Sequence, residues 1–128
     1  MIVKTLDEII GSPSHVSGEA FDGHRLLLAS DGLGYSFHDT RIKAGTVQHL
    51  HYKNHIEANY CVAGEGSVEE VATGKTWPIA PGTLFVLDQH DAHIVRAKTD
   101  IHLICIFTPA LTGQEIHDKD GSYAAPDG

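Results

Sequence analysis

The segment HYKNHIEANYCVAGEG, residues 51–66, combines a strand signal with an unusual number of ionisable side chains. Residues 57–63 are rich in strand-forming types, and the Gly64-Glu65-Gly66 turn ends them. The same short segment holds two histidines, two glutamates and a lysine. A carboxylate or imidazole inside a protein needs a partner, so such a strand does not suit a closely packed interior. The segment therefore predicts a strand with one face directed into a ligand cavity.

Short strands separated by turns recur along the rest of the chain. Turns at Asp31-Gly32, at residues 73–75 and at Pro81-Gly82 divide them. We expect a helical turn over residues 4–10, a turn-rich stretch over 12–20, and strands over residues 25–29, 34–42, 47–52, 57–63, 66–71, 76–79, 83–87, 93–97 and 101–107. Many short strands at this spacing predict an all-β, antiparallel sandwich or barrel, and a small barrel encloses one ligand cavity.

The composition narrows the class of protein. The 128 residues suit one domain spanning residues 1–128, and the net charge of −8 argues against a nucleic-acid partner. No apolar run is long enough to span a membrane, and the N-terminus lacks the pattern of a secretory signal. We therefore expect a cytoplasmic protein with Cys61 and Cys105 as free thiols. Ten histidines make a metal site or an acid–base site worth seeking.

Strand periodicity suggests which ionisable side chains meet. Residues two apart share a face, so His49 and His51 point together, as do Glu57 and Asn59. If the strands over 47–52 and 57–63 pair antiparallel, His51 and Glu57 can meet across the sheet. His49 suits a solvated outer face, whereas a surface position and a pocket position are equally compatible with His51. His55 follows an asparagine in a predicted turn, and we expect it to be exposed.

The spacing resembles the two motifs of the cupin superfamily. In the first, G-x5-H-x-H-x3-4-E-x6-G, this chain has Gly45, His51, Glu57 and Gly64 in register, with Lys53 in place of the second histidine. In the second, G-x5-P-x-G-x2-H, Gly82 and His93 are in register, while Asp88 and His90 replace the proline and the glycine. The resemblance implies a jelly-roll barrel in which imidazole and carboxylate side chains converge on a divalent metal.

A closer resemblance covers nearly the whole chain. The stretches MIVKTLDEIIG, RLLLASDGLGYSFHDT, HYKNHIEANYCVAGEG, PGTLFVLDQHDAH and CIFTPALTGQEIHDKDGSYA together resemble ectoine synthases. That family is a group of hydro-lyases that close N-γ-acetyl-L-2,4-diaminobutyrate into the cyclic amidine ectoine, a compatible solute used against osmotic stress. The resemblance implies a metal ion, ferrous iron first, with zinc and nickel as alternatives.

The family's residues carry over position by position. The metal-binding glutamate and histidine match Glu57 and His93, with His51 as a further candidate ligand. The family's metal-binding tyrosine is replaced by Phe85. Glu115, His117, Cys105 and Tyr52 match the family's substrate pocket, and for proton transfer in this reaction we expect Glu115 and His117 first, followed by Cys105 and Tyr52. For substrate binding it implies Arg25, Thr40, Phe107 and Phe21, the last in place of a tryptophan.

Phe85 leaves three accounts of the metal site. His51 completes a set with Glu57 and His93, a water molecule fills the position, or the chain acts on something else. The last account includes a cupin enzyme for a related small amino-acid derivative and a non-catalytic solute-binding cupin. The resemblance further implies a homodimer, and a lid over the barrel mouth formed by the tail at residues 109–128, whose end we expect to be flexible.

Overall fold

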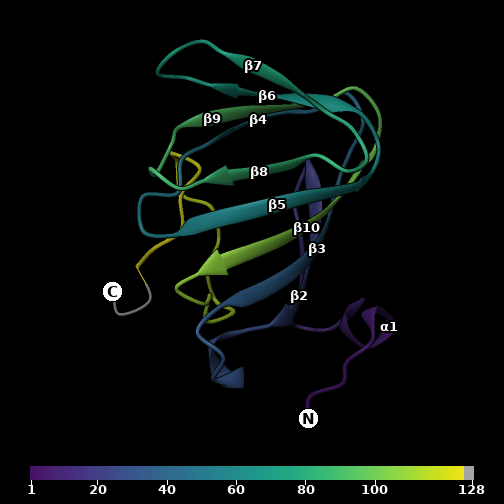
Figure 1. Cartoon of the computed structure of the whole chain (residues 1–128). Coiled ribbons are helices and arrows are strands. Elements are labelled where there is room, and N and C mark those ends of the chain that lie inside the picture. Colours follow the sequence, from purple (N-terminus) through teal and green to yellow (C-terminus); the bar gives the residue numbers. More distant parts are fainter. Residues whose placement is uncertain (126–128) are drawn as a thin grey trace.

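The computed structural model describes residues 1–125 and consists almost entirely of antiparallel β-strands (Figure 1). A six-stranded sheet has the order β1-β2-β3-β10-β5-β8, and a four-stranded sheet has the order β4-β9-β6-β7. The strands are β1 (His15–Ser17), β2 (Phe21–Leu27), β3 (Ser36–Ile42), β4 (Val47–Leu50), β5 (Ile56–Ala63), β6 (Gly66–Glu70), β7 (Thr76–Ile79), β8 (Leu84–Leu87), β9 (His93–Ala97) and β10 (Ile101–Thr108).

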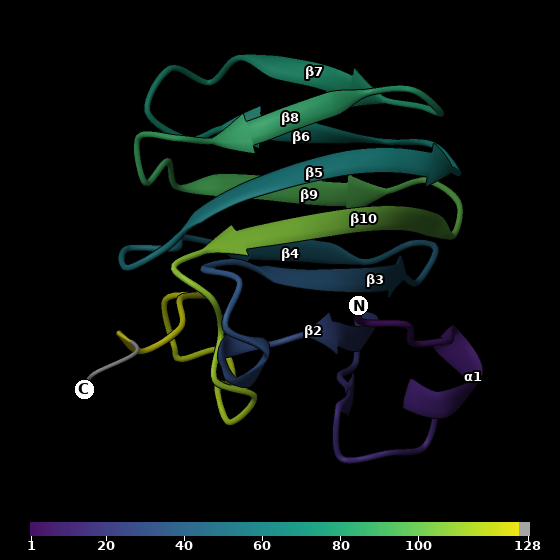
Figure 2. The same cartoon turned by 60° about the horizontal axis from the view of Figure 1, so that its bottom comes forward.

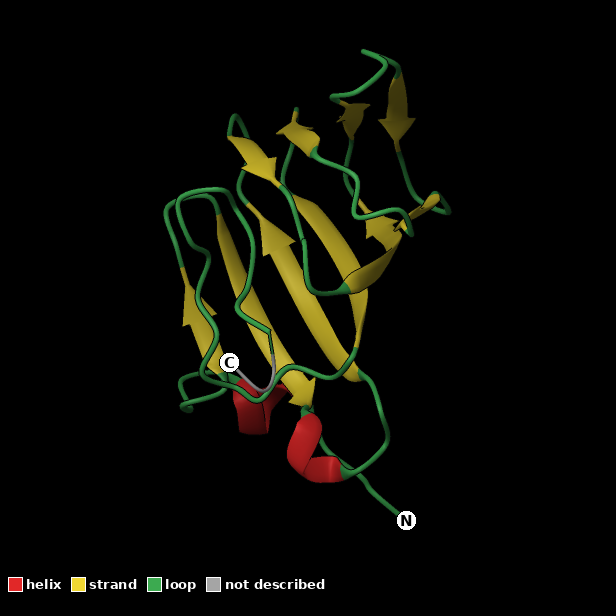
Figure 3. Cartoon of the chain, turned by 90° about the vertical axis from the view of Figure 1, so that its left-hand side faces the viewer, coloured by secondary structure: helices red, strands yellow, loops and turns green. Residues whose placement is uncertain are grey.

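From β3 onward the chain crosses back and forth between the two sheets, except that β6 and β7 form a hairpin within one sheet, and this path gives a jelly-roll barrel (Figures 1 and 2). Strands β4, β6, β7 and β9 belong to one sheet, and β3, β5, β8 and β10 to the other. The expected all-β antiparallel barrel is confirmed. Figure 3 shows how little of the chain is helical: α1 (Leu6–Ile9) and the 3₁₀ turn η1 (Ala29–Asp31). The Thr5 side chain caps α1 by accepting from the Glu8 amide.

The expected hairpin between residues 47–52 and 57–63 is wrong. Strand β4 pairs with β9, and β5 pairs with β10 and β8. Each strand has an interior face that must be covered by the opposite sheet, and the loop after Leu50 is long enough to cross between the sheets. His51 and Glu57 are therefore not cross-strand neighbours.

The N-terminal region holds more strand than its composition indicates. Residues 12–20 were expected to be turns, yet β1 pairs with β2 there. The hydroxyl of Ser17 donates to the Asp22 carboxylate, and His15 lies 3.1 Å from the same carboxylate. Polar side-chain contacts thus stabilise a strand that hydrophobic periodicity does not predict.

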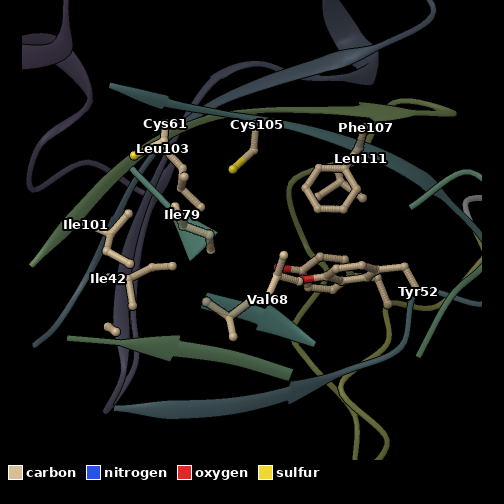
Figure 4. Close-up of a cluster of buried hydrophobic side chains, with 13 residues drawn as sticks. Ile42, Tyr52, Cys61, Val68, Ile79, Ile101, Leu103, Cys105, Phe107 and Leu111 are labelled. Atoms are coloured by element: carbon tan, nitrogen blue, oxygen red, sulfur yellow. The ribbon is translucent and has the colours of Figure 1, made fainter. Parts of the chain in front are cut away.

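The barrel interior is divided into two zones. Aliphatic side chains such as Ile42, Ile79 and Ile101 fill one end, while Tyr52 and Phe107 mark the other (Figure 4). Packing at the aliphatic end explains the motif glycine Gly64, which has a φ of 97°. A Cβ atom there would overlap the carbonyl oxygen of Asp100, the residue before β10. Only glycine satisfies both conditions.

The segment after β10 packs against the loop that follows β4. The Asn54 side-chain amide donates to the Tyr123 carbonyl, and the Lys53 backbone amide donates to the Ser122 hydroxyl. The Lys53 ammonium pairs with Asp120 at 2.9 Å. Gly121 lies against the His49 backbone so closely that a side chain would not fit. The end of the tail, which we expected to be flexible, comprises residues 126–128, and these lie outside the described residues. No helix in residues 1–125 has the length and apolar character needed to cross a membrane.

Candidate functional site

A cavity of about 50 Å³ opens in the barrel at the aromatic end. Its walls come from both sheets and from the segment after β10. Most of the residues singled out from the sequence lie in these walls: Phe21, Arg25, Thr40, Tyr52, Phe85, Glu57, His93, Cys105, Phe107 and His117. His51 and Glu115 lie outside the lining formed by the described residues.

The two-residue period of the strands brings these side chains together. Ser36 and His38 on β3 point to the interior with Thr40, and Cys105 and Phe107 on β10 point the same way (Figure 4). Cross-strand pairing then sets neighbours, since Glu57 on β5 lies opposite Phe107 and Asn59 lies opposite Cys105.

Several polar atoms in the walls lack a partner. Within residues 1–125, six buried side-chain nitrogen atoms have no hydrogen-bond partner, and four of them line this cavity. They are Arg25 Nη1, Gln48 Nε2, Asn59 Nδ2 and His93 Nε2. Buried polar groups are almost always satisfied in native proteins. The cavity is therefore shaped for a polar ligand that supplies acceptors to the amide and guanidinium nitrogens.

Glu57 and His93 offer donor atoms for a metal. His93 is 2% exposed, its Nδ1 is hydrogen-bonded to the Asp91 carbonyl at 2.9 Å, and its Nε2 has no partner among the described residues. A backbone carbonyl holding one ring nitrogen is the usual support for a histidine that binds a metal through the other. Burial lowers the pKa of His93, which keeps the imidazole neutral, and burial raises the pKa of Glu57 to about 7. One nitrogen and one carboxylate donor fit a divalent ion.

Residues 1–125 bring no third histidine, cysteine, aspartate or glutamate together with Glu57 and His93 as a metal ligand. Among residues 1–125 no three His, Cys, Asp or Glu side chains form a group suited to hold a metal ion. Phe85, on β8 opposite Asn59, places a phenyl ring in the wall where the resemblance implies a tyrosine. The His51 backbone amide donates to the Gly121 carbonyl at 3.0 Å, which ties this residue to the C-terminal segment.

Tyr52 and His117 form a hydrogen-bonded pair in the cavity wall. The Tyr52 hydroxyl lies 2.8 Å from His117 Nε2. Burial raises the pKa of Tyr52 well above 10, so the phenol keeps its proton. Burial, together with the Arg25 charge, lowers the pKa of His117 to about 4. The pair is therefore neutral at pH 7, with one proton to give and one nitrogen to receive it. Tyr123 stacks on His117 at 4.5 Å between ring centroids.

Cys105 is a protonated thiol. Its Sγ lies 3.0 Å from the Asn59 side-chain oxygen and 3.5 Å from the Thr40 hydroxyl. Burial raises its pKa well above the usual value, and the Glu57 charge acts in the same direction. A thiolate is the reactive form of cysteine, so this environment does not favour a nucleophile.

Glu115 stabilises the segment that follows β10. Its carboxylate accepts from the amides of Thr112 at 2.7 Å and Gly113 at 2.9 Å. Burial tends to raise its pKa, but these hydrogen bonds outweigh it and hold the pKa below the usual range. Its main-chain carbonyl accepts from Arg25 Nη2 at 2.7 Å. Glu115 thus positions Arg25, which lines the cavity.

Sequence reasoning missed several residues at the site. Gln48, His38 and Tyr123 line the cavity. The signal for His38 was present, because it stands two residues before Thr40 on the same strand. Tyr123 lies in a polar tail that gives no burial signal. His55 was expected to be exposed and is fully buried between the rings of Phe107 and Tyr123, so that expectation is wrong.

Comparison with known proteins finds relatives that match this chain over nearly its full length. The family model described as ectoine synthase matches residues 1–127. The L-ectoine synthase of Halomonas elongata is 54% identical over 99% of this chain and 94% of its own length. That of Halalkalibacterium halodurans is 51% identical, over 99% and 98% of the two chains. The crystal structure of ectoine synthase from P. lautus superposes with a TM-score of 0.89 at 46% identity, covering 94% of this chain and 87% of that one.

More distant structures share the fold. An RmlC-like cupin from Shewanella frigidimarina has a TM-score of 0.63 at 21% identity, over 74% of this chain and 81% of its own. The cupin-type barrel expected from the two motifs is therefore confirmed.

Proposed function

This chain belongs to the ectoine synthase family, and we propose that its cavity closes N-γ-acetyl-L-2,4-diaminobutyrate into ectoine with a divalent metal held by Glu57 and His93. The activity is that of a hydro-lyase, since ring closure releases water. The observation that carries the proposal is the set of unpartnered polar atoms in one buried cavity, His93 Nε2 among them.

Ring closure is a demanding reaction for the substrate alone. The α-amine must attack the carbonyl carbon of an acetamide within the same molecule, and the carbonyl oxygen must leave as water. The amide is a weak electrophile, and a protonated amine is no nucleophile. A divalent metal, ferrous iron first, supplies a Lewis acid for the carbonyl oxygen when bound. Zinc and nickel suit the same nitrogen and oxygen donors.

Arg25 suits the substrate carboxylate. Its Nη2 is fixed by the Glu115 carbonyl, while its Nη1 is buried and finds no partner within residues 1–125. A guanidinium held in this way is preorganised for a carboxylate. Thr40, Phe21 and Phe107 complete the walls around a substrate folded close to a ring. Holding the amine near the carbonyl converts a flexible chain into a near-attack conformer.

The Tyr52–His117 pair suits proton transfer. The substrate amine loses a proton as the carbon–nitrogen bond forms, and the departing oxygen gains protons. With His117 Nε2–H donating to the Tyr52 oxygen, the imidazole collects the amine proton at Nδ1. The phenol passes its own proton to the departing oxygen and is reprotonated by the imidazole. One proton thus passes from the amine to the departing oxygen, and both partners are neutral again afterwards, with the imidazole proton now on Nδ1. The second proton that completes the water follows once His117 has exchanged its proton and regained the Nε2–H form.

Water exclusion follows from the aromatic walls and the C-terminal segment. Tyr123 and His117 stack together at the mouth, and Phe21 lies 5.5 Å from His117 between ring centroids. We propose that residues 109–125 act as the lid. Excluding bulk water favours a reaction that releases water and strengthens the polar contacts inside.

The metal assignment is tested by removing its two ligands separately. Glu57→Ala and His93→Ala should each lose bound iron, measured by metal analysis after anaerobic loading, and lose ectoine formation together with it. His49→Ala is the matched control, because His49 is exposed on β4 next to Leu50, the residue paired with His93. A Glu57→Ala protein that kept full activity without metal would overturn the assignment. Turnover of a related amino-acid derivative alone, or binding without turnover, would instead support one of the two alternatives raised by Phe85.

We further propose a cytoplasmic homodimer whose product serves as a compatible solute under osmotic stress. Support for the dimer comes from β8, an edge strand with Leu84 63% and Val86 42% exposed, and from Tyr60 on the neighbouring β5. Both cysteines are free thiols, which suits a reducing compartment. Light scattering during gel filtration tests the dimer, and Val86→Lys should shift the protein toward a monomer.

A further inference from the structure

His38 stands in the cavity wall without a role in the reaction described above. It lies on β3, is 4% exposed, and meets the Phe107 ring edge-on at 5.1 Å between centroids. Across the sheet its register partner is Arg25. Neighbours on one face of an antiparallel pair lie close enough for their side chains to act together. His38 is therefore placed beside the guanidinium that we assign to the substrate carboxylate.

Ser36 fixes the protonation pattern of the His38 ring. The Ser36 oxygen accepts from the Leu111 amide at 3.2 Å and lies 2.9 Å from His38 Nε2. Ser36 is fully buried, so its hydroxyl proton needs an acceptor. Within residues 1–125 the acceptor available to it is His38 Nε2. The hydroxyl therefore donates to Nε2, and the ring proton resides on Nδ1.

The His38 ring stays neutral in this environment. Burial lowers its pKa to about 3, and the Arg25 charge acts in the same direction. A neutral ring whose Nε2 accepts from Ser36 has one remaining polar group, the Nδ1–H donor. The described residues offer no hydrogen-bond partner to Nδ1.

Arg25 Nη1 is the second free donor at this position, because Nη2 is held by the Glu115 carbonyl. Two neighbouring donors match the two oxygens of a carboxylate. We propose that His38 is a substrate-binding residue whose Nδ1–H joins Arg25 Nη1 in receiving the substrate carboxylate, and that Ser36 is a positioning residue that fixes the imidazole tautomer. The inference rests on the proposed function for the identity of the substrate, but the tautomer does not depend on it.

The tautomer is tested first, on the unaltered protein. Long-range ¹H–¹⁵N correlation spectra of histidine-labelled protein distinguish a ring protonated on Nδ1 from one protonated on Nε2. We expect His38, assigned by its loss in His38→Asn, to carry the proton on Nδ1 at pH 7. Ser36→Ala should shift that ring toward the Nε2–H form. A wild-type His38 protonated on Nε2 would overturn the proposal, whether or not the protein makes ectoine.

Kinetics of two amide variants test the donor. In His38→Asn the side-chain amide falls near the place of Nδ1, whereas in His38→Gln it falls near the place of Nε2 and reaches Ser36 instead. We expect His38→Gln to raise KM by about 10- to 100-fold, the range for a lost hydrogen bond to a charged group, while kcat changes little. His38→Asn should recover most of that loss. Equal KM values for the two folded variants would refute the role of the Nδ1–H donor. A wild-type protein without ectoine synthesis would count against the proposed function instead.

Discussion

Replacing Tyr52 with phenylalanine removes one oxygen atom from the cavity wall and leaves the ring in place. The hydroxyl that pairs with His117 Nε2 at 2.8 Å is lost. The hydrogen bond itself is worth about 0.5–1.5 kcal/mol, and a buried group left without a partner costs about 1–3 kcal/mol. Since both rings lie in the wall, we expect the free energy of unfolding to fall by about 1–3 kcal/mol.

The effect on catalysis should exceed the effect on stability. If the Tyr52–His117 pair carries the protons, its loss should lower kcat by about 100-fold or more, the usual contribution of general acid–base catalysis. KM should change less, because the contact removed, from the Tyr52 hydroxyl to the departing oxygen, is used in the proton transfer, while the groups assigned to the substrate carboxylate remain in place. Urea denaturation and chromatographic assay of ectoine measure the two quantities. Tyr60→Phe is the control, since Tyr60 lies on β5 with 48% of its surface exposed. A Tyr52→Phe enzyme as active as Tyr60→Phe would refute the proton relay.

Three further predictions follow from the packing, the buried histidines and Phe85. Gly64→Ala should lower the free energy of unfolding by about 2–5 kcal/mol, because a left-handed backbone and an overlap with Asp100 both oppose the new methyl group. Urea denaturation measures this change. The control is Gly32→Ala, where the new methyl group meets open space and should lower the free energy of unfolding by less. The pKa values of His38 and His117, about 3 and about 4, lie below that of a free imidazole, so the unfolded chain binds more protons between those values and 6.5. The two neutral rings therefore stabilise the folded protein above pH 6.5, and each loses about 1.4 kcal/mol of that stabilisation per pH unit as the pH falls. Glu57, whose pKa is raised to about 7, has the opposite effect on the free energy of unfolding between pH 4.5 and 7. Denaturation at pH 7 and pH 5 should therefore show lower stability at pH 5, and equal or higher stability there would contradict the assignment of two neutral histidines. Phe85→Tyr should bind ferrous iron about tenfold more tightly or better, measured by competition with a chelator, and unchanged affinity would place Phe85 away from the metal.

The strands were predictable because their signal is local. Alternation and turn residues fix where a strand begins and ends, and the predicted strand at 76–79 agrees with β7. Which strands pair is not a local property. Both β4 and β5 present an interior face, and nothing in their residues says that the loop between them crosses to the opposite sheet. The predicted neighbourhood of His51 and Glu57 was wrong for this reason.

The site was predictable where motif residues stand on strands. Glu57 and His93 followed from their match to the motifs that the chain resembles, and the structure brings both to one cavity. His90 occupies the motif glycine position with a φ of 54°, so the backbone keeps the left-handed turn although the residue has changed. Tyr123 escaped prediction because its burial depends on tertiary contacts of a polar segment with the loop after β4. Such tertiary contacts cannot be predicted from the composition of the segment alone.

The most direct test of the account is the reaction itself. Anaerobically purified protein, with and without ferrous iron, is incubated with N-γ-acetyl-L-2,4-diaminobutyrate and ectoine is measured by chromatography. The account predicts ectoine that depends on added iron, with Glu57 and His93 sufficient as protein ligands despite Phe85. A folded, iron-loaded protein that forms no ectoine from this substrate would contradict it.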